Sequence, residues 1–142
     1  MVGIRNLNYC INSYAYKIKI RTMKQLSKCM KITKNNFIGA WRITKMSEWD
    51  NDYVNEEVRA FIRIEKSGIG EFHFGLVQGS MSGDFEKENE DVIYDFTWDG
   101  SDECNEASGD GWMKINKEGT AEGEIRFHMG DKSKFWAKKA KE

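Results

Sequence analysis

The side chains best suited to chemistry gather in one acidic stretch, "DGSDECNEASGDGW", which covers residues 99–112. Its polar members are Asp99, Asp102, Glu103, Asn105, Glu106 and Asp110, and they surround Cys104. Such oxygens can hold Ca²⁺, and paired carboxylates can act as general acid and base. However, the order Asp-x-Asp-x-Asp-Gly is missing, and no adjacent histidine would activate Cys104 as a nucleophile.

We therefore expect residues 99–112 to form a solvated acidic turn or short helix, the longest connection between two strands, whose glycines let Trp112 re-enter the sheet. If the domain has a site outside its core, this connection is the first place to look. Asp102, Glu103 and Trp112 are its candidate ligand contacts.

A second group of candidates lies in "MSEWDNDYVNEE", residues 46–57. Trp49 and Tyr53 are four residues apart, a spacing that places both rings on one face of a helical turn. Such a turn can be a lid whose aromatic rings line the mouth of a ligand site, or a plug that closes the core. Calcium binding by Asp50 and Asp52 is disfavoured, because the glycine and distal glutamate of a hand-type loop are missing.

The two histidines, His73 and His128, fall on polar faces of predicted strands. A zinc site would need further ligands from Glu71, Glu124 or Asp131, and exposed surface histidines are far commoner. The sequence contains no glycine-rich phosphate loop, catalytic triad order or zinc spacing. We expect no metal and no cofactor, and we assign no catalytic residue.

Charge is distributed unevenly along the 142 residues. Residues 1–47 hold ten of the 22 basic residues and no acid, so 12 basic residues face all 23 acidic ones from residue 48 onward. Such an acidic body repels nucleic-acid phosphates and anionic membranes, so neither is an expected partner. The basic segment lacks the clustering that would favour a polyanion.

The location is expected to be cytoplasmic. Cys10, Cys29 and Cys104 are an odd number without metal-like spacing, which favours reduced thiols. No apolar run approaches the roughly 18 residues of a membrane span, and polar residues interrupt any signal-peptide core. Residues 1–34 are expected to be either a basic tail that docks or binds something, or a weakly ordered or helical extension outside the fold. A start of translation at Met23 or Met30 is one explanation for the second case.

Residues 35–142 are expected to form one domain, because alternation at period two starts at Phe37. It predicts eight half-buried strands over residues 37–46, 57–66, 70–79, 80–88, 92–100, 111–117, 121–129 and 133–139. Among the predicted inward residues are Val58, Leu76 and Met129. Eight short strands joined mostly by tight turns favour an all-β, antiparallel up-and-down barrel. The inward set is bulky, so the barrel is expected to enclose a small cavity or none.

Gly39 and Trp41, at the start of the first strand, resemble the Gly-x-Trp signature of lipocalins and related calycin barrels. In those families the Trp packs across one barrel end, and a basic residue late in the last strand lies over its ring. The resemblance implies that Lys138 or Lys139 takes that position, and we assign Lys138. Those families usually have arginine there.

A broader likeness runs from Phe37 to about Lys139. The strings "GAWRITKMSEWDNDYVNEE", "EFHFGLVQGSM", "FTWDGSDECNEASGDGW" and "RFHMGDKSKFWAKK" resemble a family of small bacterial proteins without a characterised activity. This likeness supports the domain boundaries and implies no mechanism.

The sequence thus favours a non-enzymatic binding module, monomeric or dimeric. It would bind a protein partner or a small apolar ligand at the barrel end that bears Trp49 and Tyr53. The alternative is an enzyme that uses the carboxylates between Asp99 and Asp110, and a third reading is an interaction domain without any cavity.

Overall fold

The computed structural model describes residues 31–141. The fold reported below belongs to the unit formed by Ile32–Glu142. The predictions for the basic N-terminal segment lie outside the described residues, except at residues 31–34.

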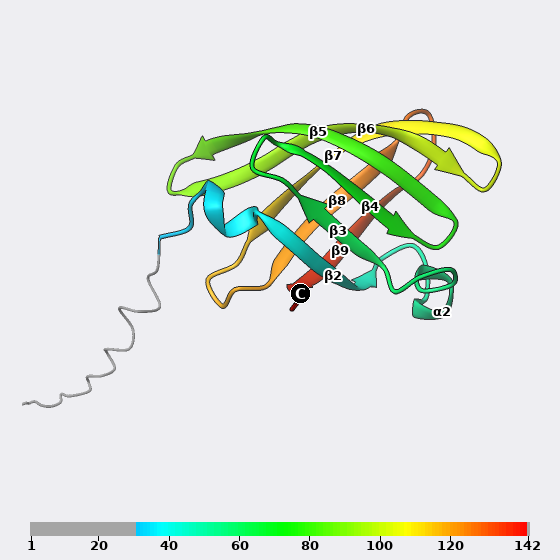
Figure 1. The fold of residues 1–142 in the computed structure, drawn as a ribbon, viewed down its shortest axis with the longest axis horizontal. Helices are drawn as coiled ribbons and strands as arrows, with labels where there is room; N and C mark the ends of the chain where they lie inside the picture. Colours follow the sequence, from blue (N-terminus) through cyan, green and yellow to red (C-terminus); the bar gives the residue numbers. More distant parts are fainter. Residues whose placement is uncertain (1–30, 142) are drawn as a thin grey trace, which may run out of the picture. The chain divides into compact units, whose positions relative to one another are not determined.

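The described chain forms a closed barrel in which each strand pairs antiparallel with the next and the last returns to the first (Figure 1). Its strands are β2 (Gly39–Met46), β3 (Phe61–Ile64), β4 (Ile69–Phe74), β5 (Val77–Glu88), β6 (Asp91–Asp102), β7 (Asn105–Ile115), β8 (Ala121–Phe127) and β9 (Lys132–Lys139). The predicted eight-stranded up-and-down barrel is confirmed. Pairing between β2 and β9 closes the sheet, so both strands use the backbone groups that an open edge would leave unpaired.

Two short helical segments flank β2. The 3-10 helix η1 (Lys34–Phe37) precedes the strand and buries Phe37. The α-helix α2 (Asn51–Val54) follows it, and the Asp50 side chain accepts a hydrogen bond from the Tyr53 N–H at 3.0 Å. This cap satisfies one of the free N–H groups at the helix start. The helical turn contains Tyr53, but Trp49 lies before its cap, so only part of the predicted turn is helical.

Aromatic side chains fill the barrel interior. Phe72, Phe74, Tyr94 and Phe96 are each at most 1% exposed. The Phe72 and Phe74 rings stack at 5.8 Å, and the Tyr94 and Phe96 rings stack at 5.3 Å. The Tyr94 hydroxyl donates to the Gly68 carbonyl at 2.7 Å, which satisfies its buried polar atom. The space available to a stored ligand is therefore occupied by the protein's own side chains.

Glycines placed opposite aromatic residues make this filling possible. Gly79 pairs with Phe72, and Gly123 pairs with Phe135. A Cβ atom at Gly79 would lie 2.5 Å from the Phe72 ring, and one at Gly123 would lie 2.7 Å from the Phe135 ring. Each ring therefore lies over the bare backbone of the neighbouring strand, which lets large side chains fit inside a narrow barrel.

The structure corrects the predicted connections. Residues 99–112 are not a long loop, because β6 continues to Asp102 and β7 begins at Asn105, leaving a two-residue turn. The predicted strand over residues 70–79 is also wrong, because the chain reverses at Gly75 and Leu76. These acidic and glycine-containing segments are long antiparallel hairpins.

Three predicted inward residues are also corrected. Val58 is 40% exposed, because β3 starts only at Phe61. Leu76 is half-buried, because it lies in the turn between β4 and β5. Met129 is 94% exposed, because β8 ends at Phe127.

Candidate functional site

Four connections meet at the barrel end that carries α2, because alternate turns of a meander lie at the same end. They join β2 to β3, β4 to β5, β6 to β7 and β8 to β9. Backbone hydrogen bonds link them: Gly75 N donates to Val54 O at 2.8 Å, and Glu103 N donates to Leu76 O at 2.9 Å. His128 N donates to Ser108 O at 2.7 Å. We call this end the α2 end.

Aromatic rings form a continuous surface at the α2 end. The Trp49 ring lies 5.9 Å from Tyr53, 5.3 Å from Phe74 and 6.3 Å from Phe127, measured between centroids. Phe74 is buried, whereas the other three are half-buried and reach the surface. We call Trp49, Tyr53 and Phe127 the aromatic floor. Its inner side closes the core, as the plug reading predicts, and its outer side faces solvent.

The aromatic floor lines an open hollow of about 340 Å³, which we call the end groove. Its walls come from the ends of β6 and β7 and from the turn after β8. The polar residues among its lining are Asp102, Asn105, Glu106, Ser108, His128 and Asp131. The structure thus brings three candidates, Trp49, Tyr53 and Asp102, into one hollow.

The end groove is acidic. Asp102, Glu106 and Asp131 line it, and within residues 31–141 none of these three carboxylates has a salt bridge. The lining contains His128 but neither lysine nor arginine. The connections around it and the strand residues that flank them, residues 47–60, 102–106 and 128–132, hold nine acidic residues and two basic ones. The α2 end therefore has a negative potential.

Two residues at this end have left-handed backbone conformations although neither is glycine. Glu103, in the turn between β6 and β7, has φ 60°, and Met129, in the turn after β8, has φ 57°. Such conformations cost about 1–2 kcal/mol for residues with a Cβ atom. Met129 directly follows a lining residue of the end groove and projects its apolar side chain into solvent.

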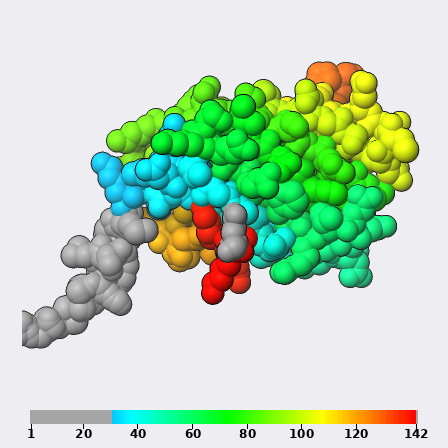
Figure 2. Space-filling view, viewed as in Figure 1, coloured from blue at the N-terminus to red at the C-terminus, as the bar shows by residue number. Residues whose placement is uncertain are grey.

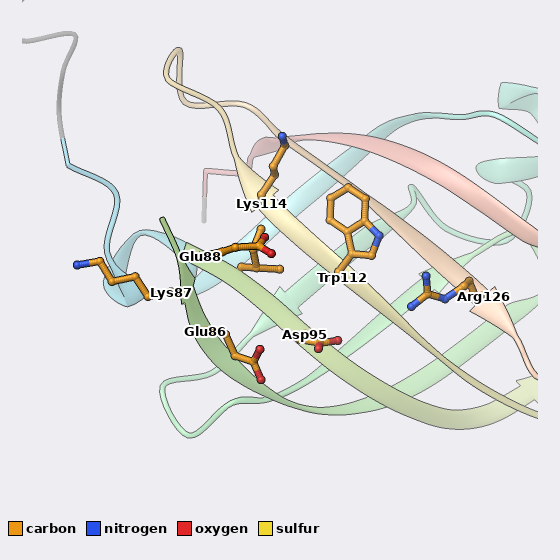
Figure 3. Close-up of a pocket in the computed structure, with 8 residues that line it drawn as sticks. Glu86, Lys87, Glu88, Asp95, Trp112, Lys114 and Arg126 are labelled. Carbon is orange, nitrogen blue, oxygen red and sulfur yellow. The ribbon is translucent and has the colours of Figure 1, made fainter. Parts of the chain in front are cut away.

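Trp112 lies in a different hollow, on the outer face of the sheet (Figure 3). In register it stands between Asp95 on β6 and Glu124 on β8. This hollow of about 530 Å³ is also lined by Lys114 and Arg126. Trp112 therefore does not join Trp49 and Tyr53, and Glu103, at the tip of its turn, is exposed and does not line the end groove.

An ion-pair network involves Asp110, one of the carboxylates considered for acid/base chemistry. Arg126 Nε donates to Asp110 Oδ1 at 2.9 Å, and Arg126 Nη1 donates to Glu124 Oε1 at 3.1 Å. The hydrogen bond from Arg126 outweighs partial burial and lowers the pKa of Asp110. A carboxylate held ionised in this way is poorly suited to act as a general acid.

The opposite barrel end is closed around Trp41. Its indole Nε1 donates to the Phe37 carbonyl at 3.0 Å, and Lys139 Nζ lies 4.7 Å from its ring centroid. Lys139 also donates to the Ile38 carbonyl and passes close to Gly39, where a Cβ atom would be 3.1 Å from Nζ. The lysine over Trp41 is therefore Lys139 and not Lys138. Lys139 is the cross-strand partner of Trp41, and neighbouring residues on a strand point to opposite faces.

The two histidines are in separate environments. His73 Nε2 lies 3.1 Å from Glu57 Oε1, which ties β4 to the connection after α2. His128 lines the end groove. Within residues 31–141, no group of three or more His, Cys, Asp or Glu side chains is arranged to hold a metal ion. The helices of this region are too short and too polar to cross a membrane.

Comparison with family models, with curated proteins and with solved structures finds no match to this chain. The geometry of the protein itself is therefore the basis for its functional assignment.

Several residues of the end groove were not assigned to this site from sequence. Phe127 was predicted as inward, whereas His128 and Asp131 were considered only as zinc ligands. Counting strands provides the missing signal, since the turn after β8 must share an end with the connection that contains Trp49 and Tyr53. The eight predicted strands have the same order as the observed ones, so this relation could have been inferred from the sequence.

Proposed function

We propose that this protein is a non-enzymatic binding module that acts through the end groove. The observation that carries this proposal is an open hollow of about 340 Å³ over half-buried aromatic rings, next to an interior filled by side chains. Binding sites commonly combine an apolar, aromatic lining with a few polar groups. The end groove has the aromatic part of such a lining, but six of its twelve lining residues are polar.

The likeness to lipocalins and other calycins supports binding at a barrel end, and we propose a distant relation to them. Trp41 and Lys139 close one end of the barrel, which leaves the α2 end for a ligand. The ligand would lie across the aromatic floor and outside the barrel, because Phe72, Phe74 and Phe96 occupy the interior. This arrangement differs from that of a container.

The enzyme alternative receives less support. Its carboxylates lie along two paired strands and a tight turn, and Asp110 is engaged by Arg126. Cys104 is exposed in that turn. We therefore assign no reaction.

Nuclear magnetic resonance of the isotope-labelled protein tests the proposal with three small probes of similar size. These are 4-methylphenol, which is neutral, n-butylamine, which is cationic, and butyrate, which is anionic. We expect at least one probe to cause saturable shifts in amides of residues 49–53, 105–108 and 127–131. The absence of saturable shifts with all three, or shifts confined to another face, would contradict a binding role for the end groove.

A matched pair of variants locates the binding. Trp49→Leu removes a ring of the aromatic floor, whereas Trp112→Leu removes a half-buried indole from the outer sheet face. We expect Trp49→Leu to weaken binding of the responding probe roughly tenfold and Trp112→Leu to leave it unchanged. Circular dichroism of both variants establishes that the barrel is retained. Equal losses in the two variants would place the binding elsewhere.

A further inference from the structure

We propose that the occupant of the end groove is a basic segment of another protein. A lysine or arginine side chain of that segment would lie over the aromatic floor, with its charged head among the carboxylates of Asp102, Glu106 and Asp131. This inference rests on the proposed binding function and names the chemistry of the partner.

The charges around the end groove select a cation. Asp102 lies on β6, Glu106 on β7 and Asp131 in the turn after β8, so three separate elements bring carboxylates to one hollow. None of the three is neutralised by a basic side chain within residues 31–141. A cation entering the groove would supply the missing opposite charge, whereas an anion would be repelled.

The aromatic floor suits the rest of such a side chain. The faces of tryptophan and tyrosine rings attract lysine and arginine cations, and the aliphatic stem of a basic side chain packs well on apolar surface. Trp49 and Tyr53 lie side by side, with ring centroids 5.9 Å apart. Both residues line the end groove, so its occupant would contact two neighbouring rings.

The surroundings of the groove favour a protein segment over a free amine. The hollow is open to solvent, and a small molecule needs most of its surface buried to bind well. Met129 is 94% exposed beside the groove, and methionine is enriched at protein interfaces. A segment longer than one side chain could bury Met129 while its basic residue occupies the groove.

The acidic field also extends beyond the groove. In the space-filling view, the connection containing α2, the tip of the β6–β7 hairpin and the β8–β9 turn lie at the same end of the barrel (Figure 2). With nine acidic residues against two basic ones, these connections would guide a basic segment toward the groove. The same charge disfavours a symmetric dimer through this end, since two acidic ends would face each other.

Two heptapeptides with blocked termini test the inference in the 142-residue protein. In the basic peptide, glycine alternates with arginine or lysine. In the acidic peptide, glycine alternates with glutamate. We expect the basic peptide to produce saturable shifts at the end groove, with affinity that falls as salt is added. We expect no response to the acidic peptide.

Charge-matched variants separate local recognition from net charge. One triple variant removes the groove carboxylates by combining Asp102→Asn, Glu106→Gln and Asp131→Asn. It should weaken binding of the basic peptide about tenfold. The control combines Glu86→Gln, Glu88→Gln and Glu90→Gln, which are exposed at the opposite barrel end. It changes the net charge by the same amount and should alter the affinity for the basic peptide by no more than about twofold.

A further variant tests Met129. Met129→Gly should keep the fold, because glycine readily adopts the left-handed backbone conformation of this residue. It should weaken the binding of a basic peptide that carries an added leucine.

Each outcome bears on the inference. Comparable binding of the acidic peptide, or equal losses in the two triple variants, would overturn a basic partner while leaving the binding function intact. The basic partner would also be overturned if butylamine bound as tightly as the basic peptide, because the occupant would then be a free amine. It would likewise be overturned if sedimentation showed a dimer that the groove variants dissociate. If neither the peptides nor the small probes affect the groove, both the inference and the proposed function are wrong.

Discussion

Trp41 shows how single residues fix the closure of the barrel. Its ring is 2% exposed, its indole N–H is satisfied by Phe37, and Lys139 covers its face. Alternation along the first strand predicted that Trp41 points inward, but two adjacent lysines near the end of the last strand left its partner ambiguous. Only the register between β2 and β9, which the structure supplies, selects Lys139.

Replacing Lys139 by methionine should therefore destabilise the barrel. The variant Lys139→Met keeps an apolar stem but loses the cation above Trp41 and the hydrogen bond to Ile38, so we expect a loss of about 1 kcal/mol in the free energy of unfolding. Lys138→Met is the matched control on the exposed face and should change it by less than about 0.5 kcal/mol. Urea unfolding measures both, and equal effects would contradict the assignment of Lys139.

The contact between Asp110 and Arg126 makes a pH-dependent contribution. Because the pKa of Asp110 is lowered in the folded state, its stabilisation is complete above the unfolded-state value near 3.8 and declines as pH falls through the folded-state value. Both side chains are more than a third exposed, so the contribution should be small, about 0.5 kcal/mol.

Asp110→Asn should accordingly lower the free energy of unfolding at neutral pH by that amount and have less effect near pH 3. Asp99→Asn, on the neighbouring strand, is the control and should leave the pH profile unchanged. Denaturant unfolding across this pH range measures the difference. A loss for Asp110→Asn that persists at acid pH would show that the ion pair is not its cause.

At the scale of elements, the hairpins explain why sequence patterns failed between residues 99 and 112. A buried face produces alternation, but from Asp99 to Glu106 both faces of the β6–β7 hairpin are exposed or half-buried. Such a segment needs no apolar periodicity, so its glycines and acidic residues resemble the composition of a loop. By contrast, residues 92–98 alternate clearly because Tyr94, Phe96 and Trp98 fill the core.

The turn at Glu103 offers a test of backbone strain. Glu103→Gly should raise the free energy of unfolding by about 0.5–1 kcal/mol, because glycine adopts its left-handed conformation more readily. Gly119→Ala is the converse change, at φ 93° and with no atom within 4 Å of the added Cβ, and should lower it by about 1 kcal/mol. Thermal or urea unfolding measures both signs, and a destabilised Glu103→Gly would show that the side chain has a structural role.

At the scale of the whole barrel, eight alternating runs were sufficient to predict the topology. Their inward residues also predicted a filled interior, as Phe72, Phe74, Tyr94 and Phe96 demonstrate. The site was less predictable. Trp49 and Tyr53 were recognised from their spacing. Strand order alone places Phe127, Glu106 and Asp131 at the same barrel end, but which side chains of that end line one hollow depends on strand registers that a single sequence does not specify.

The filled interior predicts a large difference between two phenylalanines. Phe96→Ala should cost about 3–5 kcal/mol, because it leaves a cavity beside Tyr94. Phe61→Ala removes the same atoms from a half-buried position on the barrel exterior and should cost about 1 kcal/mol or less. Calorimetric unfolding gives both values. A filled interior would be contradicted if the wild-type barrel bound a hydrophobic dye and this binding was unchanged in Trp49→Leu and in the triple variant of the groove carboxylates.

The pairing of β2 with β9 also means that the order of strands around the barrel has no natural starting point. Ala140 N donates to Ala40 O at 2.9 Å, so the beginning of the first strand and the end of the last are adjacent. A short genetic linker could join them, and new termini could be opened in the exposed turn between β7 and β8. Such a circular permutant would keep every strand ladder while leaving the acidic α2 end intact, which makes the barrel a suitable scaffold for displaying altered binding loops.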